Sequence, residues 1–131
     1  LSDTLATLPK RNILVVDDNK DAAESLAILL QLTGSEVHTA HDGLEAVDAA
    51  SVYKPDVAII DIGLPRLNGY EVARRIRSEH GDRIFLIALT GWGQDEDRRK
   101  SVEAGFDHHL TKPIGIDGLK KVLAMAEERV R

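Results

Sequence analysis

Short apolar runs recur along the chain, and their residues do not alternate strictly with polar ones. The clearest are Ile13–Val16, Val57–Ile60 and Ile84–Leu89, with a weaker run at Phe106–Leu110. Short runs rich in valine, isoleucine and leucine are typical of strands that are buried on both faces of a parallel sheet. The pattern therefore predicts strands at these positions and, with one more between the first two helices, a total of five.

Segments with a helical repeat separate the strands. Gly34 stands where the left-handed residue after the first helix is expected. A fourth helix is predicted at Gln94–Ala104 and a fifth from about Ile116. Good capping residues mark the starts of the first three helices: Asn19, Asp42 and Asn68. Glutamate follows the second and third of these caps by three positions, as in a capping box. Five strands and five helices are thus expected to alternate.

Apolar positions at helical spacing predict which face of each helix is buried. The expected inward residues, helix by helix, are Ala23, Leu26, Ala27 and Leu30; Leu44, Val47 and Ala50; Val72, Ala73 and Ile76; and Leu119, Val122, Leu123 and Ala126. Arg74, Arg75 and Arg77 are expected to point outward. The helix at Gln94–Ala104 is mostly charged, so its buried stripe should be thin.

Strict alternation of strands and helices indicates an α/β domain with right-handed crossovers and a doubly wound parallel sheet. Such a sheet has a crevice beyond the carboxyl ends of its strands. The polar residues that close the apolar runs should surround this crevice. They are Asp17, Asp18, Asp61, Thr90 and Lys112.

Composition fits one domain and narrows its partners. The chain has 131 residues, 22 acidic against 17 basic side chains and a net charge of −5, which argues against direct nucleic-acid binding. No apolar run has the length of a membrane span, and no secretory signal is visible. The domain is therefore expected to lie in the cytoplasm and to make no contact with the membrane. Residues 1–10 are predicted to be a linker or upstream tail, and residues 11–131 the domain.

The polar residues also suggest a chemistry. At an effective dielectric near 20, each close carboxylate pair among Asp17, Asp18 and Asp61 repels by about 4 kcal/mol, so the group needs a counter-charge. Oxygen ligands favour a hard cation such as Mg²⁺, which keeps coordination positions for a phosphoryl oxygen. Lys112 and Thr90 could bind the other phosphoryl oxygens. Asp61, alone at the end of the middle strand, is the best candidate nucleophile.

These motifs together resemble the response-regulator receiver domain. The resemblance extends from about Arg11 onward and implies a flavodoxin-like (βα)5 fold with strand order 2-1-3-4-5. It is carried by Ile13–Asn19, Pro55–Asp61, Leu64–Pro65, Asn68–Gly69, Leu89–Gly91 and Lys112–Pro113.

The resemblance implies a phosphorelay acceptor. Asp61 would take a phosphoryl group from a phosphohistidine of a sensor histidine kinase or a histidine phosphotransfer domain. Asp18 and the Gly63 carbonyl would bind Mg²⁺ directly, and Asp17 through water. Lys112 would pair with Asp61 and then with the phosphoryl oxygen.

The resemblance also implies a switch. Thr90 would swing toward the phosphate and vacate space for an aromatic side chain on the last strand, but here that position is His109, whose polar ring can change its charge. The peptide before Pro113 would be cis and hold the lysine. Gly91 replaces a common alanine and opens the loop. Trp92 would limit the access of water to the acyl phosphate, a hypothesis that the phosphorylated lifetime of Trp92→Ala tests.

Other classes of protein use some of the same residue types, but they fit this chain less well. A phosphatase of the haloacid-dehalogenase type needs an acid two positions after its nucleophile, where this chain has Gly63. A flavodoxin-like cofactor binder needs a phosphate loop after the first strand, where aspartates would repel phosphate. A pseudo-receiver that only makes protein contacts is disfavoured by the complete set of site residues. His38 and His41 are expected to be solvated surface residues rather than zinc ligands.

The resemblance also suggests an interface and a parent protein. The face formed by the fourth helix, the last strand and the fifth helix would serve output or homodimerisation. Residues 89–110 are similar to receivers attached to hybrid histidine kinases. A hybrid kinase is therefore the favoured origin, and a single-domain regulator is the alternative.

Overall fold

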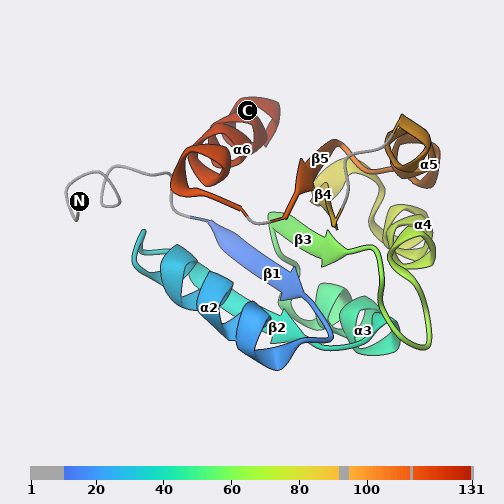
Figure 1. The fold of residues 1–131 in the computed structure, drawn as a ribbon, viewed down its shortest axis with the longest axis horizontal. Helices are drawn as coiled ribbons and strands as arrows, with labels where there is room; N and C mark the ends of the chain where they lie inside the picture. Colours follow the sequence, from blue (N-terminus) through green and yellow to red (C-terminus); the bar gives the residue numbers. More distant parts are fainter. Residues whose placement is uncertain (1–10, 92–94, 113, 131) are drawn as a thin grey trace.

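A five-stranded parallel sheet forms the centre of the protein (Figure 1). The computed structural model describes residues 11–91, 95–112 and 114–130, so the predicted linker at residues 1–10 lies outside the described residues. The strands are β1 (Asn12–Val16), β2 (Glu36–Ala40), β3 (Val57–Asp61), β4 (Phe85–Thr90) and β5 (His108–Thr111). Their order, β2-β1-β3-β4-β5, confirms the predicted doubly wound sheet.

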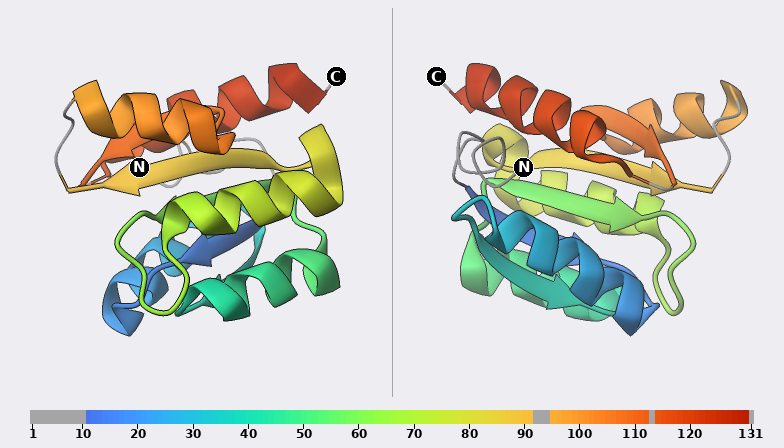
Figure 2. Two further views of the ribbon diagram at one scale, coloured as in Figure 1. Left: turned by 90° about the vertical axis from the view of Figure 1, so that its right-hand side faces the viewer. Right: turned by 60° about the vertical axis from the view of Figure 1, so that its left-hand side comes forward.

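Helices cover both faces of the sheet, as the two views in Figure 2 show. The helical elements are α2 (Lys20–Gln31), α3 (Gly43–Tyr53), α4 (Gly69–His80), the short 3₁₀ helix η1 (Gly81–Arg83), α5 (Asp95–Ala104) and α6 (Ile116–Val130). Alternate residues of each strand point to opposite faces, so Ile13 and Val15 pack with α2 and α6, whereas Leu14 and Val16 pack with α3 and α4. Within the described ranges, no helix is both long and apolar enough to cross a bilayer.

The expected helix starts are confirmed. The side chains of Asn19, Asp42 and Asn68 each accept a hydrogen bond from the backbone N–H of the third residue after them. These bonds satisfy amide groups that have no partner within the helix. Because α2, α3 and α4 follow β1, β2 and β3, the caps hold the loops at the carboxyl ends of these strands.

The apolar face that the pattern predicts for α3 is partly wrong. Leu44 is 44% exposed, whereas Ala50 is buried as expected and Val47 packs partly buried against the core. Ala46 and Ala49, which the pattern does not single out, are buried as well. The start of α3 lies very close to the loop before α4, since a Cβ on Gly43 would stand 2.0 Å from the carbonyl oxygen of Leu67.

The last strand begins at His108 rather than at Phe106. Gly105 has a positive φ of 104°, which turns the chain after α5. Phe106 fills the core from this turn. The apolar pattern therefore places the start of the strand too early, because Phe106 is buried although it lies in the preceding turn.

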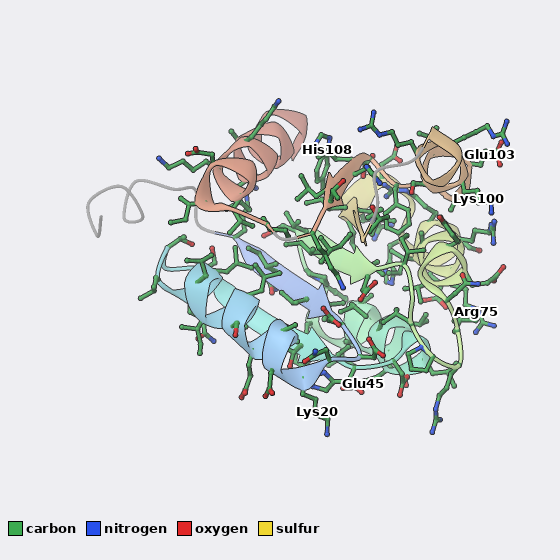
Figure 3. The ribbon with its side chains drawn as sticks, in the orientation of Figure 1. Lys20, Glu45, Arg75, Lys100, Glu103 and His108 are labelled. Atoms are coloured by element: carbon green, nitrogen blue, oxygen red, sulfur yellow. The ribbon has the colours of Figure 1, made fainter. Side chains whose placement is uncertain are left out.

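Arg77 was expected to point outward, and this is also wrong. Its Nε donates to the Gly105 carbonyl at 2.8 Å, and its other nitrogens donate to the carbonyls of Gly81 and Ile84 and to the Asp107 carboxylate. The long side chain of Arg77 reaches partners beyond the end of α4, which a helical wheel does not reveal. Arg75 by contrast is exposed and extends away from the domain (Figure 3).

Candidate functional site

Three carboxylates meet at the carboxyl ends of two adjacent strands. β1 pairs with β3 so that Val16 lies beside Ile60, which places Asp17 and Asp61 next to each other. Oxygens of Asp17, Asp18 and Asp61 all lie within 4.8 Å of one another. Among the described residues, this is the only group of three or more acidic, histidine or cysteine side chains that is arranged to hold a metal ion.

Lys112 supplies the positive charge in this pocket. Its Nζ lies 2.7 Å from Asp61 Oδ2 and 3.7 Å from Asp17 Oδ2. The Lys112 backbone N–H donates to the Thr90 carbonyl at 2.8 Å, which extends the pairing of β4 with β5 by one residue and aims the side chain at the pocket. Burial pulls the pKa of Lys112 down, but its hydrogen bond to Asp61 and the three nearby carboxylate charges raise it above the ordinary value.

Asp17 is only 4% exposed, and its surroundings are unfavourable for a negative charge. Burial raises the pKa of Asp17, and the charges of Asp61 and Asp18 add to this effect. A hydrogen bond from the Asn19 N–H and the charge of Lys112 lower it only in part. One lysine faces three carboxylates, so a hard cation bound by these oxygens would relieve the remaining repulsion.

Both oxygens of Asp61 are held. Oδ1 accepts a hydrogen bond from the Gly63 N–H at 3.0 Å, and Oδ2 receives the Lys112 ammonium. The loop after Asp61 is fixed as well. The Ile62 N–H donates to the Leu89 carbonyl, and the Gly69 N–H donates to the Ile62 carbonyl. Gly69 packs so closely that a Cβ there would lie 2.7 Å from the Asp61 carbonyl oxygen. The carboxylate is therefore oriented before any ligand binds.

The hydroxyl of Thr90 forms a hydrogen bond with His109, the residue that stands where receiver domains usually have an aromatic side chain. Thr90 Oγ1 lies 2.9 Å from Nε2 of His109 on β5 and 3.5 Å from the Leu110 carbonyl oxygen. Gly91 is exposed beside Thr90. Trp92 and Pro113 lie outside the described residues, so their predicted roles remain predictions.

His41 contributes to the site, contrary to its expected solvated position. Its Nδ1 lies 3.1 Å from the backbone carbonyl oxygen of Asp17. His38 is also not simply solvated, because its ring stacks on Tyr53 with the centroids 3.6 Å apart. The signal for His41 was its place directly after β2, since β2 neighbours β1 and both strands end at the same edge of the sheet.

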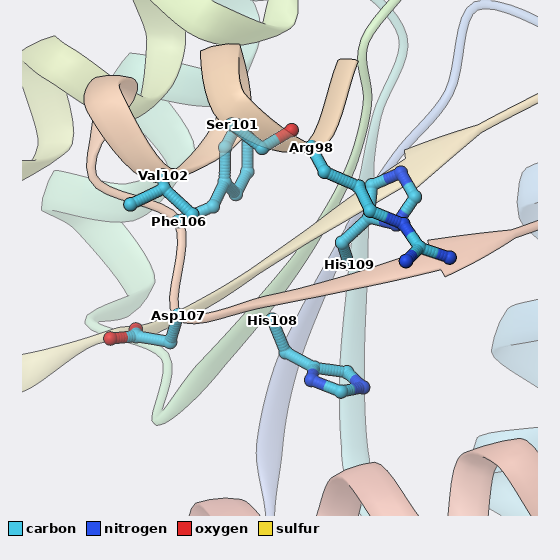
Figure 4. A pocket seen from close by; sticks show the side chains of 7 residues that line it. All are labelled: Arg98, Ser101, Val102, Phe106, Asp107, His108 and His109. Atoms are coloured by element: carbon cyan, nitrogen blue, oxygen red, sulfur yellow. The ribbon is translucent and has the colours of Figure 1, made fainter. Parts of the chain in front are cut away.

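The surface has one pocket beside the acceptor site and another between α5 and β5. One, of about 350 Å³, has Asp17 and Lys112 at one end and is otherwise lined mainly by apolar residues, among them Leu26, Leu29 and Ile114. The other, of about 380 Å³, lies between α5 and β5 and is lined by Arg98 and His109 among others, while His108 points to the other side of the strand (Figure 4). Burial, and next the charge of Lys121, lower the pKa of His108.

Comparison with known sequences gives a consistent result. The family model described as the response regulator receiver domain matches residues 13–124. Response regulator MprA of Mycobacterium avium (strain 104) is 40% identical over 107 residues, which are 82% of this chain and 46% of the relative. MprA of Mycobacterium tuberculosis (strain H37Rv) is 39% identical over the same lengths. The chain thus spans about half the length of the curated relatives it matches.

Solved structures agree in fold. The receiver domain of the Francisella response regulator 1452 has a TM-score of 0.84 and 27% identity, over 93% of this chain and 100% of that chain. The receiver domain of the sensor histidine kinase PA1611 from Pseudomonas aeruginosa PAO1, which has a magnesium ion coordinated in its active-site cleft, has a TM-score of 0.80 and 33% identity, over 89% and 97% of the two chains.

Proposed function

The chain belongs to the response regulator receiver domain family, and from this premise we propose that it accepts a phosphoryl group on Asp61. One observation carries the proposal: the Asp61 carboxylate lies within 4.8 Å of two further carboxylates and 2.7 Å from the Lys112 ammonium. A nucleophilic carboxylate, a cluster of hard oxygen ligands and a cation for the phosphoryl oxygen are thus together in one pocket.

In the proposed reaction, an oxygen of Asp61 forms a bond to phosphorus while the P–N bond of the donor phosphohistidine breaks. The departing imidazole keeps the bonding electrons and takes up a proton. The Gly63 N–H and Lys112 hold the two Asp61 oxygens before transfer, and Lys112 then moves to a phosphoryl oxygen. Hydrolysis of the acyl phosphate by water ends the cycle.

Receiver domains bind Mg²⁺ at their acidic pocket, and the donors in this chain fit that ion. We assign Asp18, Asp61 and the Gly63 carbonyl as direct ligands, with Asp17 reached through water. When bound, Mg²⁺ neutralises the carboxylates and draws charge from the phosphoryl oxygens. The raised pKa of Asp17, caused chiefly by its burial, supports the need for a counter-charge beyond Lys112.

Mass spectrometry of the intact protein tests the assignment of Asp61. After incubation with acetyl phosphate and Mg²⁺, the wild type should gain the mass of one phosphoryl group, and Asp61→Asn should gain none. Reduction of the adduct with borohydride followed by peptide mapping should mark Asp61. An adduct that persists in Asp61→Asn, or that maps to another side chain, would refute the proposal.

The proposed partner is a sensor histidine kinase or a histidine phosphotransfer domain. The 350 Å³ pocket continues from Asp17 and Lys112 onto apolar side chains, so an apolar residue of the donor protein could insert there while its phosphohistidine faces Asp61. Leu29→Lys should therefore slow transfer from a phosphohistidine protein and leave the reaction with acetyl phosphate unchanged. Ile28→Lys is the matched control, because Ile28 is 58% exposed and does not line the pocket.

Thr90 and His109 form the proposed switch. To reach a phosphoryl oxygen, the Thr90 hydroxyl must leave His109 Nε2, which lies 2.9 Å away. His109 also lines the pocket between α5 and β5, so release of Thr90 changes the hydrogen bonding of the ring on the face that α5, β5 and α6 share. Gly91, Trp92 and Pro113 belong to the proposed switch by their sequence positions beside Thr90 and Lys112.

The α5–β5–α6 face is the proposed site of output or homodimerisation. Val102 is 72% exposed beside the pocket there, which supports a contact surface. Size-exclusion chromatography with light scattering, with and without beryllium fluoride as a phosphoryl mimic, tests dimerisation. The net charge of −5 supports a domain that does not itself bind nucleic acid.

We place this receiver in the cytoplasm and favour a hybrid histidine kinase as its parent protein. The receiver of the kinase PA1611, at 33% identity, supports that parent, whereas the MprA relatives support a response regulator. The sequence of the full gene distinguishes the two.

A further inference from the structure

We infer that His41 is a positioning residue that holds the peptide between Asp17 and Asp18 in the orientation required for cation binding. The inference rests on the proposed magnesium site. It concerns a side chain on the loop between β2 and α3, which has no place among the expected ligands. Its hydrogen bond from Nδ1 to the Asp17 carbonyl, at 3.1 Å, is the observation that motivates it.

The Asp17 backbone is fastened on both sides by one short segment. Its N–H donates to the Ala40 carbonyl at 3.0 Å, and its carbonyl receives the ring of the next residue, His41. A carbonyl oxygen only accepts hydrogen bonds, so Nδ1 of His41 must carry the hydrogen. Both the neutral Nδ1–H tautomer and the imidazolium satisfy this requirement, so the contact does not depend on the charge of the ring.

This contact determines where Asp18 stands. The peptide unit is planar, so fixing the carbonyl oxygen of Asp17 also fixes the N–H and Cα of Asp18. Asp18 is exposed and gains little support from packing, although its carboxylate must stay beside those of Asp17 and Asp61. Repulsion between the carboxylates pushes this loop away from the pocket whenever no cation is bound.

His41 can resist that repulsion because it is itself anchored. Its backbone N–H lies 3.3 Å from the Glu45 carboxylate, and the next residue, Asp42, caps α3. The restraint therefore passes from the first turn of α3 through the imidazole to the acidic loop. Groups that orient metal ligands in this way typically change metal affinity by tenfold or more when they are removed.

Three substitutions separate the hydrogen bond from the bulk of the ring. His41→Leu keeps an apolar side chain without a donor, His41→Asn places an amide nitrogen where Nδ1 stands, and His41→Gln places it near the position of Nε2. Calorimetric titration with Mg²⁺ should give a dissociation constant raised about tenfold in His41→Leu and His41→Gln. His41→Asn should stay close to the wild type.

A second readout does not need the metal. In nitrogen-15 NMR spectra of the metal-free protein, His41 should show a hydrogen-bonded Nδ1–H, and the Asp18 amide resonance should shift in His41→Leu but not in His41→Asn. His80→Leu, which removes a histidine at the far end of α4, should leave that resonance in place.

The outcomes separate the two proposals. If the wild type does not bind Mg²⁺, the proposed metal site fails. If the wild type binds Mg²⁺ and His41→Leu binds it equally well, the inference about His41 is overturned while the site survives. Equal weakening in His41→Asn and His41→Leu would also overturn the inference, because the donor would then not matter. Should His41→Leu fail to fold, the comparison of His41→Asn with His41→Gln remains decisive.

Discussion

The sheet has one edge where the parallel strands begin and an opposite edge where they end. Both hold partly buried charges, but the charges are balanced differently. Where β4 and β5 begin, Arg77 meets the Asp107 carboxylate and three backbone carbonyls, and Asp107 also accepts the Leu86 N–H at 2.8 Å. Where the strands end, three carboxylates share one lysine. The charges at the first edge are matched and tie elements together, whereas the second edge keeps an excess of negative charge that a bound cation would offset.

The comparison teaches how to tell a structural cluster from a binding site. A buried charge with its full set of partners fixes one conformation, and its loss exposes every partner at once. A buried charge in excess raises the energy of the ligand-free protein and lowers it again when a counter-charge arrives. The substitutions below should therefore have opposite signs at the two edges.

The largest effect is expected at the matched edge. Arg77→Ala removes the donor to the Gly105, Ile84 and Gly81 carbonyls and the partner of the Asp107 carboxylate, and should destabilise the fold by about 3 kcal/mol. Urea unfolding measures this loss. Arg75→Ala, an exposed arginine on the same helix, should change stability by less than about 0.5 kcal/mol. Equal effects of the two substitutions would remove the distinction drawn between the edges.

At the acceptor edge, the loss of a charge should stabilise the metal-free protein. The pKa of Asp17 is raised in the fold, chiefly by burial, so its ionisation costs stability above that raised pKa and costs nothing below the unfolded value of about 4. Asp17→Asn keeps an oxygen for the Asn19 N–H and should gain on the order of 1 kcal/mol at neutral pH. Thermal unfolding in a chelator measures the gain, which should shrink as the pH falls through the raised pKa of Asp17 and should be absent below about 4. A destabilised Asp17→Asn at neutral pH would contradict the assigned excess of charge.

At His109, a substitution is expected to increase the affinity for a phosphoryl mimic, by less than the effects above. His109→Phe removes the hydrogen bond that holds the Thr90 hydroxyl, so Thr90 can turn to a phosphoryl oxygen without that loss. The affinity for beryllium fluoride in the presence of Mg²⁺ should rise roughly fivefold. His109→Gln, which keeps a polar group near Nε2, should resemble the wild type. Weaker binding in His109→Phe would show that the ring supports the active state instead.

The smallest effect is expected where a pair is exposed. Arg74 and Glu71 form an ion pair on the surface of α4 with a separation of 2.8 Å, and both side chains are about half exposed. Water and salt screen such a pair, so Arg74→Ala should cost only about 0.3 kcal/mol in urea unfolding. A loss as large as that of Arg77→Ala would mean that proximity alone, without burial, decides these energies.

The fold could be predicted largely from the sequence because its signals are local. Strand runs, helix caps and the alternation of elements are each readable within about ten residues, and the resemblance supplied the strand order that local signals do not contain. The acidic pocket could also be predicted, because Asp61 ends a strand, Asp17 and Lys112 directly follow one, and parallel strands end at one edge of the sheet.

The remaining features depend on distances that no local pattern records. Arg77 and Asp107 are 30 residues apart, and only the folded chain brings the arginine to the turn after α5. Leu44 is exposed although it is apolar, and the buried residues of α3 are small, whereas the apolar pattern alone favours the larger side chain. His41 follows β2 and reaches the Asp17 carbonyl after the neighbouring strand β1, a contact that depends on the strand order rather than on the residues around His41.

The close approach of Gly69 to the strand that carries Asp61 limits which variants of this codon the protein can tolerate. Every single-base missense change of a glycine codon adds a side chain, and any side chain at position 69 collides with the backbone of Asp61 and Ile62. The same holds for Gly43, which faces the backbone of Leu67. A saturation library of the domain should therefore be depleted of all variants at these two codons, although neither residue contributes a reactive group.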